Sequence, residues 1–309
     1  MKRILITGSN GLLGQKLVEL MSRSQQYNLL LTSLEERSVF GEGTLPYIQI
    51  DTTQKQEIRK VMDEFEPEVI VNAAAITDVD KCEVEKELAW RVNVSSVENL
   101  MHSAKLIGAH LIHVSSDYVF DGKNGPYCEL DKPNPINYYG KTKLASENVL
   151  KTSGIQHTIV RTIVLYGQGR EVKNNFILWI LKSLGEQKPI RVVDDQISTP
   201  TLVEDLAYGI LKIVELERTG LYHISGPDMV SRFDMAVTAA RIFGLDKKLI
   251  TPVKSIVLRQ IAPRPMKTGF ITLKAETDLG ITMSSIEHGL TALKHQLQAD
   301  LNMSSENHS

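Results

Sequence analysis

Cysteine is scarce in this sequence of 309 residues. The two that occur, Cys82 and Cys128, cannot build a disulfide framework and show no metal-ligand spacing. The absence of a disulfide framework favours a reducing compartment, so we expect a cytoplasmic protein. The absence of ligand spacing leads us to expect no bound metal. An excess of one charge is also missing, since 35 Lys and Arg residues stand against 37 Asp and Glu residues. This balance argues against a nucleic-acid partner and against binding to a membrane surface.

Long apolar runs are absent as well. None reaches the roughly 18 residues that a membrane-spanning helix needs. The start of the chain, Met1–Arg3 followed by Ile4–Ile6, resembles a secretion signal, but its apolar run stops at Thr7 and no cleavage-type stretch follows. We therefore interpret this segment as a strand. The polar residues 302–309 predict a flexible tail.

Short apolar runs alternate with helical patterns along the chain. The runs that predict strands lie at 2–7, 28–32, 47–50, 69–71, 111–114, 158–160 and 221–224. The helical patterns lie at 12–23, 54–65, 83–107, 139–150, 176–184 and 202–217. Continuous apolar strands separated by helices imply a parallel sheet covered on both faces. We predict an α/β fold, a doubly wound parallel sheet of the Rossmann type, with a smaller C-terminal lobe for the substrate.

The chain is long for one domain and short for three. No internal repeat or low-complexity linker marks a boundary. We place the dinucleotide-binding domain in residues 1–168 together with about 200–226. The substrate-binding lobe then comprises residues 169–199 and 227–301, so the chain is expected to cross between the two parts more than once.

A glycine-rich segment, Thr7–Gly14, follows the first predicted strand directly and opens an amphipathic helix. Glycines here permit a tight turn and a close approach of the backbone to a pyrophosphate. The helix that follows offers free N–H groups and the positive end of its dipole. Such a match alone can be a mere tight turn, but its position between strand and helix is the context that the mechanism requires. The predicted pyrophosphate ligands are Gly8, Asn10, Gly11, Leu12, Leu13 and Gly14.

The end of the second strand should select the cofactor. An acidic residue there would bind both ribose hydroxyls of NAD and repel a 2′-phosphate, but no acid occurs before Glu35. This favours NADP(H), with NAD(H) as the alternative, and makes Ser33 and Arg37 candidate phosphate ligands. Arg37 fits a solvated loop charge equally well. After the third strand, Asp51 with Thr52 is expected either to reach the adenine or to cap a helix.

The pair Tyr139 and Lys143 is four residues apart on a predicted helix, so both side chains share one face. A free tyrosine has a pKa near 10; a nearby cation lowers it, and Lys143 can do this while holding the nicotinamide ribose. Such pairs also occur by chance on solvated helices. The upstream strand ending in Ser115 and Ser116 supports a site, because ligands bind beyond the carboxyl ends of parallel strands. One of these serines is expected to cap a turn instead.

These residues resemble the extended short-chain dehydrogenases, and within them the dTDP-4-dehydrorhamnose reductase family. The resemblance covers nearly the whole chain, and the segments Asn174–Phe176 and Asp194–Gln196 are closer to the reductases than to the epimerases or dehydratases. The other shared segments are Thr7–Gly14, Asn72–Ala75, Thr77–Lys81, Val92-Asn93, Ser115–Gly122, Tyr139–Glu147, Arg161-Thr162, Pro200-Thr201, Tyr222–Gly226 and Arg264-Pro265.

The resemblance implies transfer of a hydride to the C4 ketone of a nucleotide-linked deoxysugar, in the synthesis of cell-surface polysaccharide. Tyr139 would donate the proton and Lys143 would tune it. Ser116 would hydrogen-bond the carbonyl oxygen as charge develops on it, and Asn93 would hold a water in the proton relay. The residues expected to lie along the cofactor beside the fourth strand are Ala73, Ala74, Ala75 and Thr77.

The substrate side follows from the same resemblance. Arg264 is the expected partner of the diphosphate, because a guanidinium pairs phosphate oxygens bidentately. For Arg264, and for each of the other residues expected to face the sugar nucleotide, a structural role is equally open. After Arg161-Thr162 the family usually places an aromatic residue against the sugar, and here the position is Val164, which leaves the sugar open. The other residues expected to face the sugar nucleotide are Asp117, Tyr118, Asn175 and Gln196.

Residues outside these motifs are interpreted as structural. Trp90 and Trp179 fall in helical stretches and are predicted to anchor the core. The histidines lie on separate predicted elements without ligand spacing, which favours packing or surface roles over metal binding. They are His102, His110, His113, His157 and His223.

Two other classes of function stay open. One is a binding module, because the NADP-binding regulatory subunit of eukaryotic methionine adenosyltransferase is similar to this family and does not turn over. The other is a nucleotide-sugar epimerase or dehydratase, which would keep NAD through its cycle. The complete set of Ser116, Tyr139 and Lys143 favours the reductase. A homodimer is the family's habit.

Overall fold

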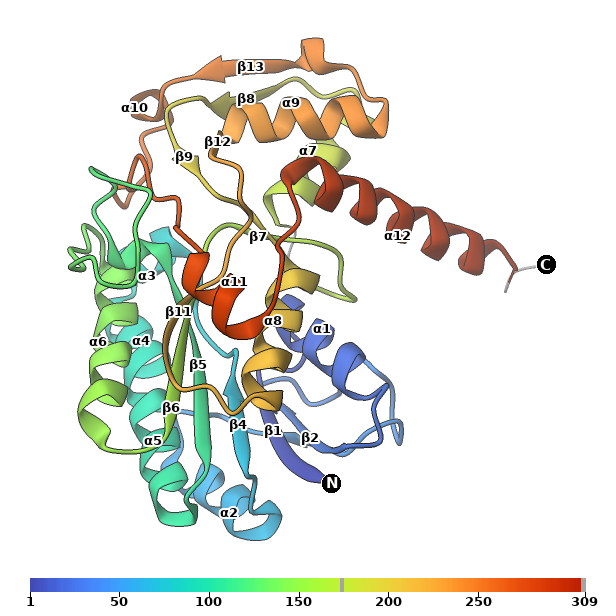
Figure 1. The fold of residues 1–309 in the computed structure, drawn as a ribbon. Coiled ribbons are helices and arrows are strands. Elements are labelled where there is room, and N and C mark those ends of the chain that lie inside the picture. The colour runs from blue at the N-terminus through green and yellow to red at the C-terminus, as the bar shows by residue number, and fades with distance from the viewer. Residues whose placement is uncertain (173–174, 307–309) are drawn as a thin grey trace.

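The computed structural model describes residues 1–172 and 175–306, with side chains as far as residue 300. Its centre is a seven-stranded sheet in the order β11-β6-β5-β4-β1-β2-β3, with every neighbouring pair parallel (Figure 1). The predicted Rossmann-type sheet is therefore confirmed. Its strands are β1 (Lys2–Thr7), β2 (Tyr27–Ser33), β3 (Tyr47–Gln49), β4 (Val69–Asn72), β5 (His110–Ser116), β6 (His157–Thr162) and β11 (Gly220–His223).

Helices cover both faces of this sheet, as its apolar strands require. One layer packs Leu17, Leu206 and Leu279 on the sheet, from α1 (Leu12–Met21), α8 (Val203–Glu215) and α11 (Leu273–Leu279). The opposite layer is formed by α2 (Lys55–Phe65), α5 (Ser96–Ile107) and α6 (Tyr138–Ser153). The strand order reverses between β1 and β4, so the carboxyl ends of these strands border the crevice where such sheets bind ligands.

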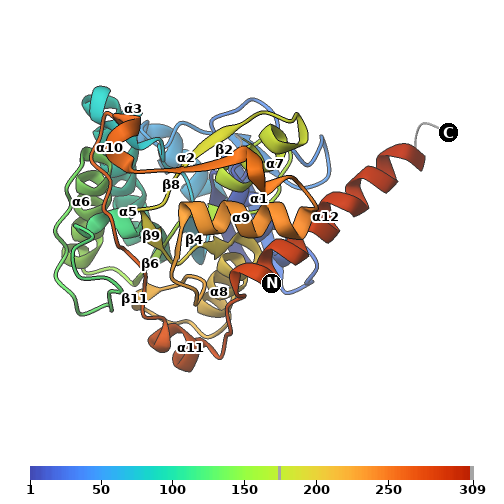
Figure 2. The same cartoon turned by 90° about the horizontal axis from the view of Figure 1, so that it is seen from above.

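The smaller lobe lies above the carboxyl ends of the strands (Figures 1 and 2). Ile180, Val192 and Ala240 form part of its own apolar core. Its elements and the short connecting strands are β7 (Leu165–Tyr166), α7 (Phe176–Gly185), β8 (Ile190–Val193), β9 (Ile197–Ser198), β10 (Thr201–Leu202), β12 (Val230–Ser231), α9 (Arg232–Phe243), η3 (Lys247–Leu249), β13 (Ile250–Val253), α10 (Ser255–Leu258) and α12 (Ile286–Glu306).

Several segments differ from the sequence prediction. The single helix expected over 83–107 is four pieces: α3 (Val79–Val84), α4 (Lys86–Trp90), a π-helical turn η1 (Arg91–Ser95) and α5. The helix α11 packs on α8 and β11, although we assigned residues 227–301 to the smaller lobe. Helix α12 continues to Glu306, inside the predicted tail, and residues 307–309 lie outside the described part.

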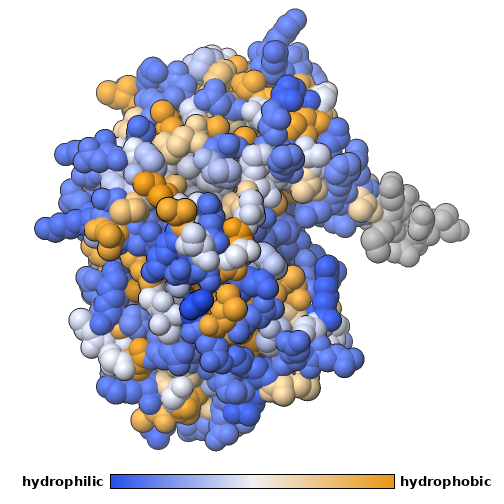
Figure 3. Space-filling view, viewed as in Figure 1, coloured by the Kyte–Doolittle hydropathy of each residue, from blue (hydrophilic) through white to orange (hydrophobic). Residues whose placement is uncertain are grey.

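The tryptophan prediction was wrong. Trp90 is 43% exposed and Trp179 is 39% exposed, so neither is a core anchor. On the face shown in Figure 3, apolar side chains are scattered among hydrophilic ones. Within the described residues, no helix combines the length and apolar character needed to cross a bilayer.

Candidate active site

The glycine-rich turn joins β1 to α1. Gly8 has φ of +68°, and a Cβ placed on it would lie 2.9 Å from the backbone nitrogen of Ala74. A Cβ on Gly14 would lie 2.2 Å from the carbonyl oxygen of Gly8. Gly11 is the N-cap of α1 and has no side chain to cap the first turn at Leu12. The turn is therefore closed to side chains at these positions and leaves its backbone open to an anion.

A buried hydroxyl lies in the same turn. Ser9 Oγ is inaccessible and has no hydrogen-bond partner among the described residues. Unpaired buried polar atoms are rare and call for an explanation. Together with the glycines, Ser9 makes a cradle that fits the pyrophosphate of a dinucleotide. Sequence reasoning missed Ser9, although its place between Gly8 and Gly11 could have indicated it.

The loop predicted to bind the adenine ribose of the cofactor is exposed, and Asn10 holds it by hydrogen bonds. The amide of Asn10 donates to the carbonyl oxygen of Arg37 over 2.8 Å and accepts from the backbone N–H of Val39 over 3.2 Å. The Arg37 side chain is 81% exposed and 3.9 Å from Glu42. Ser33 donates to the Glu35 carboxylate. Arg37 is thus free to turn toward a 2′-phosphate, whereas Ser33 is engaged.

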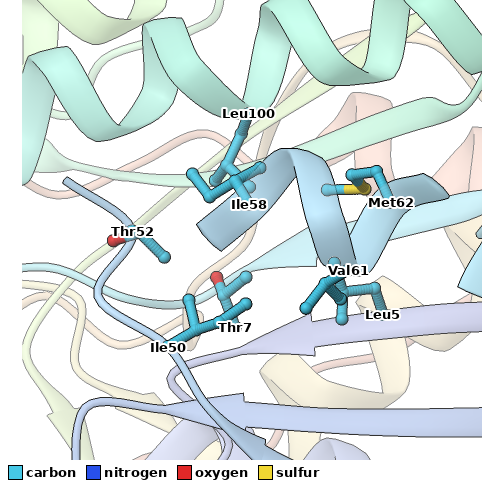
Figure 4. Close-up of a pocket in the computed structure, with 8 residues that line it drawn as sticks. All are labelled: Leu5, Thr7, Ile50, Thr52, Ile58, Val61, Met62 and Leu100. Carbon is cyan, nitrogen blue, oxygen red and sulfur yellow. The ribbon is translucent and has the colours of Figure 1, made fainter. Parts of the chain in front are cut away.

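Asp51 serves a turn in this structure. Its Oδ1 accepts from the backbone N–H of Thr53 over 2.9 Å, just before α2 begins. This bond closes a local turn before the helix, whose N-cap is Gln54, so Asp51 does not cap α2, and its contact with the adenine stays a prediction. The neighbouring Thr52 lines a small pocket between β1, α2 and α5 (Figure 4). Only the hydroxyls of Thr7 and Thr52 are polar there, so the pocket has few groups for a polar ligand.

The segment after β4 runs beside the glycine turn. The backbone N–H of Ala73 donates to the carbonyl oxygen of Thr7 over 3.2 Å, and that of Ala74 donates to Asn72 Oδ1 over 3.3 Å. Ala73, Ala74 and Ala75 are partly exposed, and Thr77 is exposed. The structure thus places the backbone of Ala73 and Ala74 next to Gly8, while the contacts of the four residues with a cofactor stay a prediction.

Ser116 and Tyr139 come together above the carboxyl end of β5. Both are buried, at 8% and 7% exposure, and Ser116 lies close enough to Tyr139 to lower the pKa of its phenol. The Ser116 hydroxyl itself donates to Asp117 Oδ1 over 2.9 Å. Ser116 also caps η2 (Asp117–Val119), accepting from the Tyr118 N–H over 3.3 Å. Ser115 instead donates to Glu147 over 2.7 Å. Ser116 therefore both caps a turn and faces the tyrosine, while Ser115 is structural.

Lys143 lies one turn below Tyr139 and is also buried. Its Nζ donates to the carbonyl oxygen of Val114 over 2.7 Å. Burial lowers the pKa of Lys143 to about 8, against the attraction of Glu147. Burial also raises the pKa of Tyr139, although Ser116 opposes it. We expected Lys143 to lower the pKa of Tyr139; instead desolvation of the phenol outweighs its neighbours.

Asn93 lies in the π-helical turn η1. Its Nδ2 donates to the Ile76 carbonyl oxygen and to Thr142 Oγ1, both over 3.1 Å, and its Oδ1 accepts from the Ile76 N–H over 2.8 Å. Such single-turn π segments often mark functional sites. The amide hydrogens of Asn93 are therefore used by the protein, and one lone pair of Oδ1 is left for a water.

A pocket beyond Ser116 lies between the two lobes. Asp117 lies in its wall, and burial raises its pKa to about 6 against hydrogen bonds from Thr268 and Ser116. Tyr118 packs edge-to-face on Tyr139, with ring centroids 5.5 Å apart. The other lining residues are Val164, Gln196, Ile197, Ser198, Arg232, Pro265 and Thr268. Three of the predicted substrate residues, Asp117, Tyr118 and Gln196, thus share one cleft.

The other two predicted substrate residues, Asn175 and Arg264, form hydrogen bonds within the protein. Asn175 caps α7: its Oδ1 accepts from the Leu178 N–H over 3.2 Å and its Nδ2 donates to the Gly167 carbonyl oxygen over 2.7 Å. Arg264 donates to Asp80 and to the Ala262 carbonyl oxygen, over 2.9 and 2.8 Å. Only one nitrogen of Arg264 is used in these bonds. Asn174 lies outside the described residues.

Arg232 is a pocket residue that sequence reasoning missed. Its guanidinium lies 5.0 Å from the centre of the Phe176 ring and makes no hydrogen bond with any described residue. Ser231 begins α9 with a capping box to Asp234, a sequence pattern that could have placed Arg232 in a first helical turn. An unpaired cation beside Asp117 gives this cleft a group that can bind an anion.

Val164, at the position where an aromatic residue was expected, lines the same cleft with φ of +41°. The described residues contain no cluster of three or more His, Cys, Asp or Glu that could hold a metal. Among the histidines, His110 bonds Thr158 over 2.8 Å and His223 stacks on Phe270 with centroids 3.9 Å apart. These two are packing residues, as interpreted.

A doubly wound sheet, a glycine turn at its switch point and the grouped Ser116, Tyr139 and Lys143 define the class: an extended short-chain dehydrogenase/reductase. The chain matches the model of the family "RmlD substrate binding domain" over residues 1–299. It belongs to that family, which confirms the resemblance seen in the sequence motifs.

Relatives with curated names cover the chain almost completely. A dTDP-4-dehydrorhamnose reductase of Aggregatibacter actinomycetemcomitans is 32% identical over 95% of this chain and 99% of its own length. Methionine adenosyltransferase 2 subunit beta of Mus musculus is 31% identical over 91% of this chain and 83% of its own length. The structure of a Bacillus anthracis dTDP-4-dehydrorhamnose reductase in complex with NADP matches with a TM-score of 0.83 and 32% identity, over 96% of this chain and 100% of that one.

Proposed function

We propose that the protein uses NADPH to reduce the C4 ketone of a nucleotide-linked deoxysugar, as a step in making cell-surface polysaccharide. The observation that carries this is the closeness of Ser116 to Tyr139, whose pKa it lowers, next to a cleft that is lined by Asp117 and an unpaired Arg232. The reductase names of its relatives, one of them a complex with NADP, support the same activity.

The residues of the chain divide the chemistry between them. NADPH, when bound on the turn of Gly8, Ser9 and Gly14, supplies the hydride that the ketone carbon accepts. Ser116 hydrogen-bonds the ketone oxygen, and Tyr139 transfers its phenolic proton to that oxygen as negative charge develops there. The ammonium of Lys143 stabilises the phenolate that remains. Hydride and proton together convert the ketone to an alcohol.

The substrate is held in the cleft between the lobes. We assign Asp117, Tyr118 and Gln196 to the sugar side, and Arg232 to the anionic diphosphate or an acidic group beside it. Arg264 would join Arg232 if it exchanges Asp80 for a phosphate oxygen. Asn175 remains a candidate only through its backbone, because its side chain caps α7. We further place the protein in the cytoplasm and expect a homodimer.

NADPH consumption with a panel of nucleotide 4-keto-deoxysugars tests the proposal. We expect oxidation of NADPH, followed at 340 nm (the absorbance of the reduced nicotinamide), and one alcohol formed per NADPH used. A protein that binds NADPH and turns over none of the panel would refute it.

The same assay separates the alternatives. The identity to methionine adenosyltransferase 2 subunit beta favours, as a second candidate, a binding module without turnover. That candidate predicts NADPH affinity without sugar-dependent oxidation. An epimerase or dehydratase would instead retain bound NAD during purification and would convert its sugar with no net loss of NADPH.

A further inference from the structure

His113 lies on β5, three residues before Ser116, and is 1% exposed. It is a register partner of Asn72 on β4, which is in turn a register partner of Thr7 on β1. The three side chains form one chain of contacts: Thr7 Oγ1 to Asn72 Oδ1 at 2.7 Å, and Asn72 Nδ2 to His113 Nδ1 at 3.1 Å. The far ring nitrogen, Nε2, reaches helix α6, 2.9 Å from Ser146 Oγ.

These contacts fix the tautomer of His113. The backbone N–H of Ala74 can only donate, and it points at Asn72 Oδ1 from 3.3 Å. The other amide atom of Asn72, Nδ2, therefore faces the ring and donates to Nδ1, which must carry no proton. A neutral imidazole has one proton, so it is on Nε2. It is donated to Ser146 Oγ, whose own hydrogen goes to the carbonyl oxygen of Lys143 over 2.8 Å.

The ring stays neutral in this position. Burial lowers the pKa of His113 well below its ordinary value, and the charge of Lys143 acts in the same direction. The titratable groups that act on Lys143 itself are Glu147 on the same helix and Cys82 on α3. No carboxylate contacts the imidazole among the described residues, so nothing there favours a second proton.

The protonated Nε2 decides where the ammonium of Lys143 can bond. Lys143 Nζ is 3.4 Å from His113 Nε2, but a nitrogen that already carries hydrogen offers it no lone pair. Within the described part of the chain, the acceptor left for Nζ is the Val114 carbonyl oxygen at 2.7 Å. The other two hydrogens of the ammonium thus have no protein acceptor on the inner side of Lys143, the side that faces His113 and β5.

We propose that His113 is a positioning residue of the active site: its Nε2–H closes the inner side of Lys143 and directs the free ammonium hydrogens toward Tyr139 and the cofactor ribose. The same hydrogen bonds tie Thr7, the residue before the glycine turn, to the catalytic helix through Ser146. A buried network of this kind is stable only when all its members are satisfied, and it then holds its partners rigidly. The proposal rests on the proposed reductase function for its catalytic meaning, but its structural claim stands apart from turnover.

Imidazole ¹⁵N NMR of the full-length protein, labelled at histidine, tests the structural claim directly. The resonance of His113 is assigned by its loss in His113→Gln. We expect the Nε2–H tautomer, unchanged from pH 6 to pH 9, with and without NADPH. An Nδ1–H tautomer, or a ring that gains a proton in this range, would overturn the proposal even in a protein without turnover.

Three variants test the positioning role. His113→Leu removes both ring nitrogens, whereas His113→Gln keeps an amide N–H near the place of Nε2. His110→Leu is the matched control, because His110 is also buried on β5 and its ring hydrogen-bonds Thr158, away from the chain of contacts around His113. We expect His113→Leu to lower kcat about tenfold or more with the KM for the sugar unchanged. His113→Gln should recover most of the loss, and His110→Leu should keep the kcat of the wild type.

NADPH affinity gives a readout that needs no sugar substrate. Loss of one directed hydrogen bond from Lys143 should weaken NADPH binding about fivefold in His113→Leu, measured by nicotinamide fluorescence, and not in His110→Leu. If wild type has no turnover but these affinities differ as stated, the reductase function fails and the role of His113 survives. If wild type is active and His113→Leu matches it in kcat and in NADPH affinity, the role of His113 is refuted.

Discussion

Arg161 on β6 and Glu147 on α6 form a bidentate ion pair beneath the catalytic helix. Nε of Arg161 is 2.8 Å from Oε1 and its NH2 is 2.6 Å from Oε2, and the two side chains are 1% and 0% exposed. Ser115 donates to the same carboxylate. The Glu147 carboxylate therefore joins the helix that carries Tyr139 and Lys143 both to β6 and to the end of β5, which carries Ser115 and Ser116.

Breaking this pair from one side should destabilise the fold strongly. Arg161→Met leaves Glu147 buried without its main partner, and we expect a loss of about 3 to 5 kcal/mol in the free energy of unfolding. Urea denaturation measures it. Asp63→Asn is the control, because Asp63 pairs with Arg59 on the exposed surface of α2, and it should change stability little. Equal small losses in both variants would contradict the argument.

The same pair predicts a dependence of stability on pH. Burial would raise the pKa of Glu147, but the hydrogen bonds and charge of Arg161 prevail and lower it. A carboxyl whose pKa is lower in the folded state adds stability above its unfolded pKa, about 4.3, and loses it as pH falls through the folded pKa. Wild type should lose stability in this acid range. Glu147→Gln, which cannot titrate, should be less stable at pH 7 and show a smaller loss on acidification.

Tyr139→Phe tests the proton donor. Removing one hydroxyl should lower kcat by about 10²- to 10⁴-fold, the usual contribution of general acid catalysis. NADPH affinity should hardly change, because the ring remains. The matched control is Tyr138→Phe, on the same helix, whose ring lies under the ammonium of Lys86. A Tyr139→Phe enzyme with wild-type kcat would exclude Tyr139 as the donor.

Lys143 predicts an alkaline limit to activity. Its pKa of about 8 means that the ammonium is present below pH 8 and is lost as the pH rises through this value. We expect kcat to fall above pH 8 in wild type. In Lys143→Arg the side chain keeps its charge at every accessible pH. The kcat of this variant should therefore not fall above pH 8, whatever its absolute value. A fall that persists in Lys143→Arg would assign it to another group.

The patterns that predicted this fold are local. Strands buried on both faces read as continuous apolar runs, and the glycine turn needs its glycines for steric reasons at Gly8 and Gly14. The π-helical turn at Arg91–Ser95 was not predictable, because the helical periodicity continues through it. Ligands and caps also use the same residue types, so the sequence left both roles open for Asp51 and Asn175; in the structure Asp51 holds a turn and Asn175 caps α7.

Arg232 shows what sequence patterns cannot supply. Its neighbours in the pocket, Asp117 and Gln196, come from distant parts of the chain, and only the packing of the smaller lobe on the sheet brings them together.

Arg232→Leu should raise the KM for the nucleotide sugar about 10- to 100-fold, since a charged hydrogen bond contributes about 1.5 to 3 kcal/mol. NADPH affinity should not change. The control is Arg241→Leu on the same helix, where the side chain is exposed and pairs with Glu287.

Gly14 should be the most restrictive position of the cofactor turn. A methyl group there would lie 2.2 Å from the Gly8 carbonyl oxygen and 2.7 Å from the Cα of Ser9, and both of these are backbone atoms that cannot move aside without deforming the turn. We expect Gly14→Ala to weaken NADPH binding more than about tenfold, because the displaced turn no longer fits the pyrophosphate. Gly185→Ala is the control: this glycine ends α7, and a Cβ there would meet nothing within 4 Å. The control should bind NADPH normally and gain about 0.5 to 1 kcal/mol of stability, since alanine is the better helix residue. Fluorescence titration with NADPH compares the two, and normal binding by Gly14→Ala would mean that the dinucleotide does not lie on this turn.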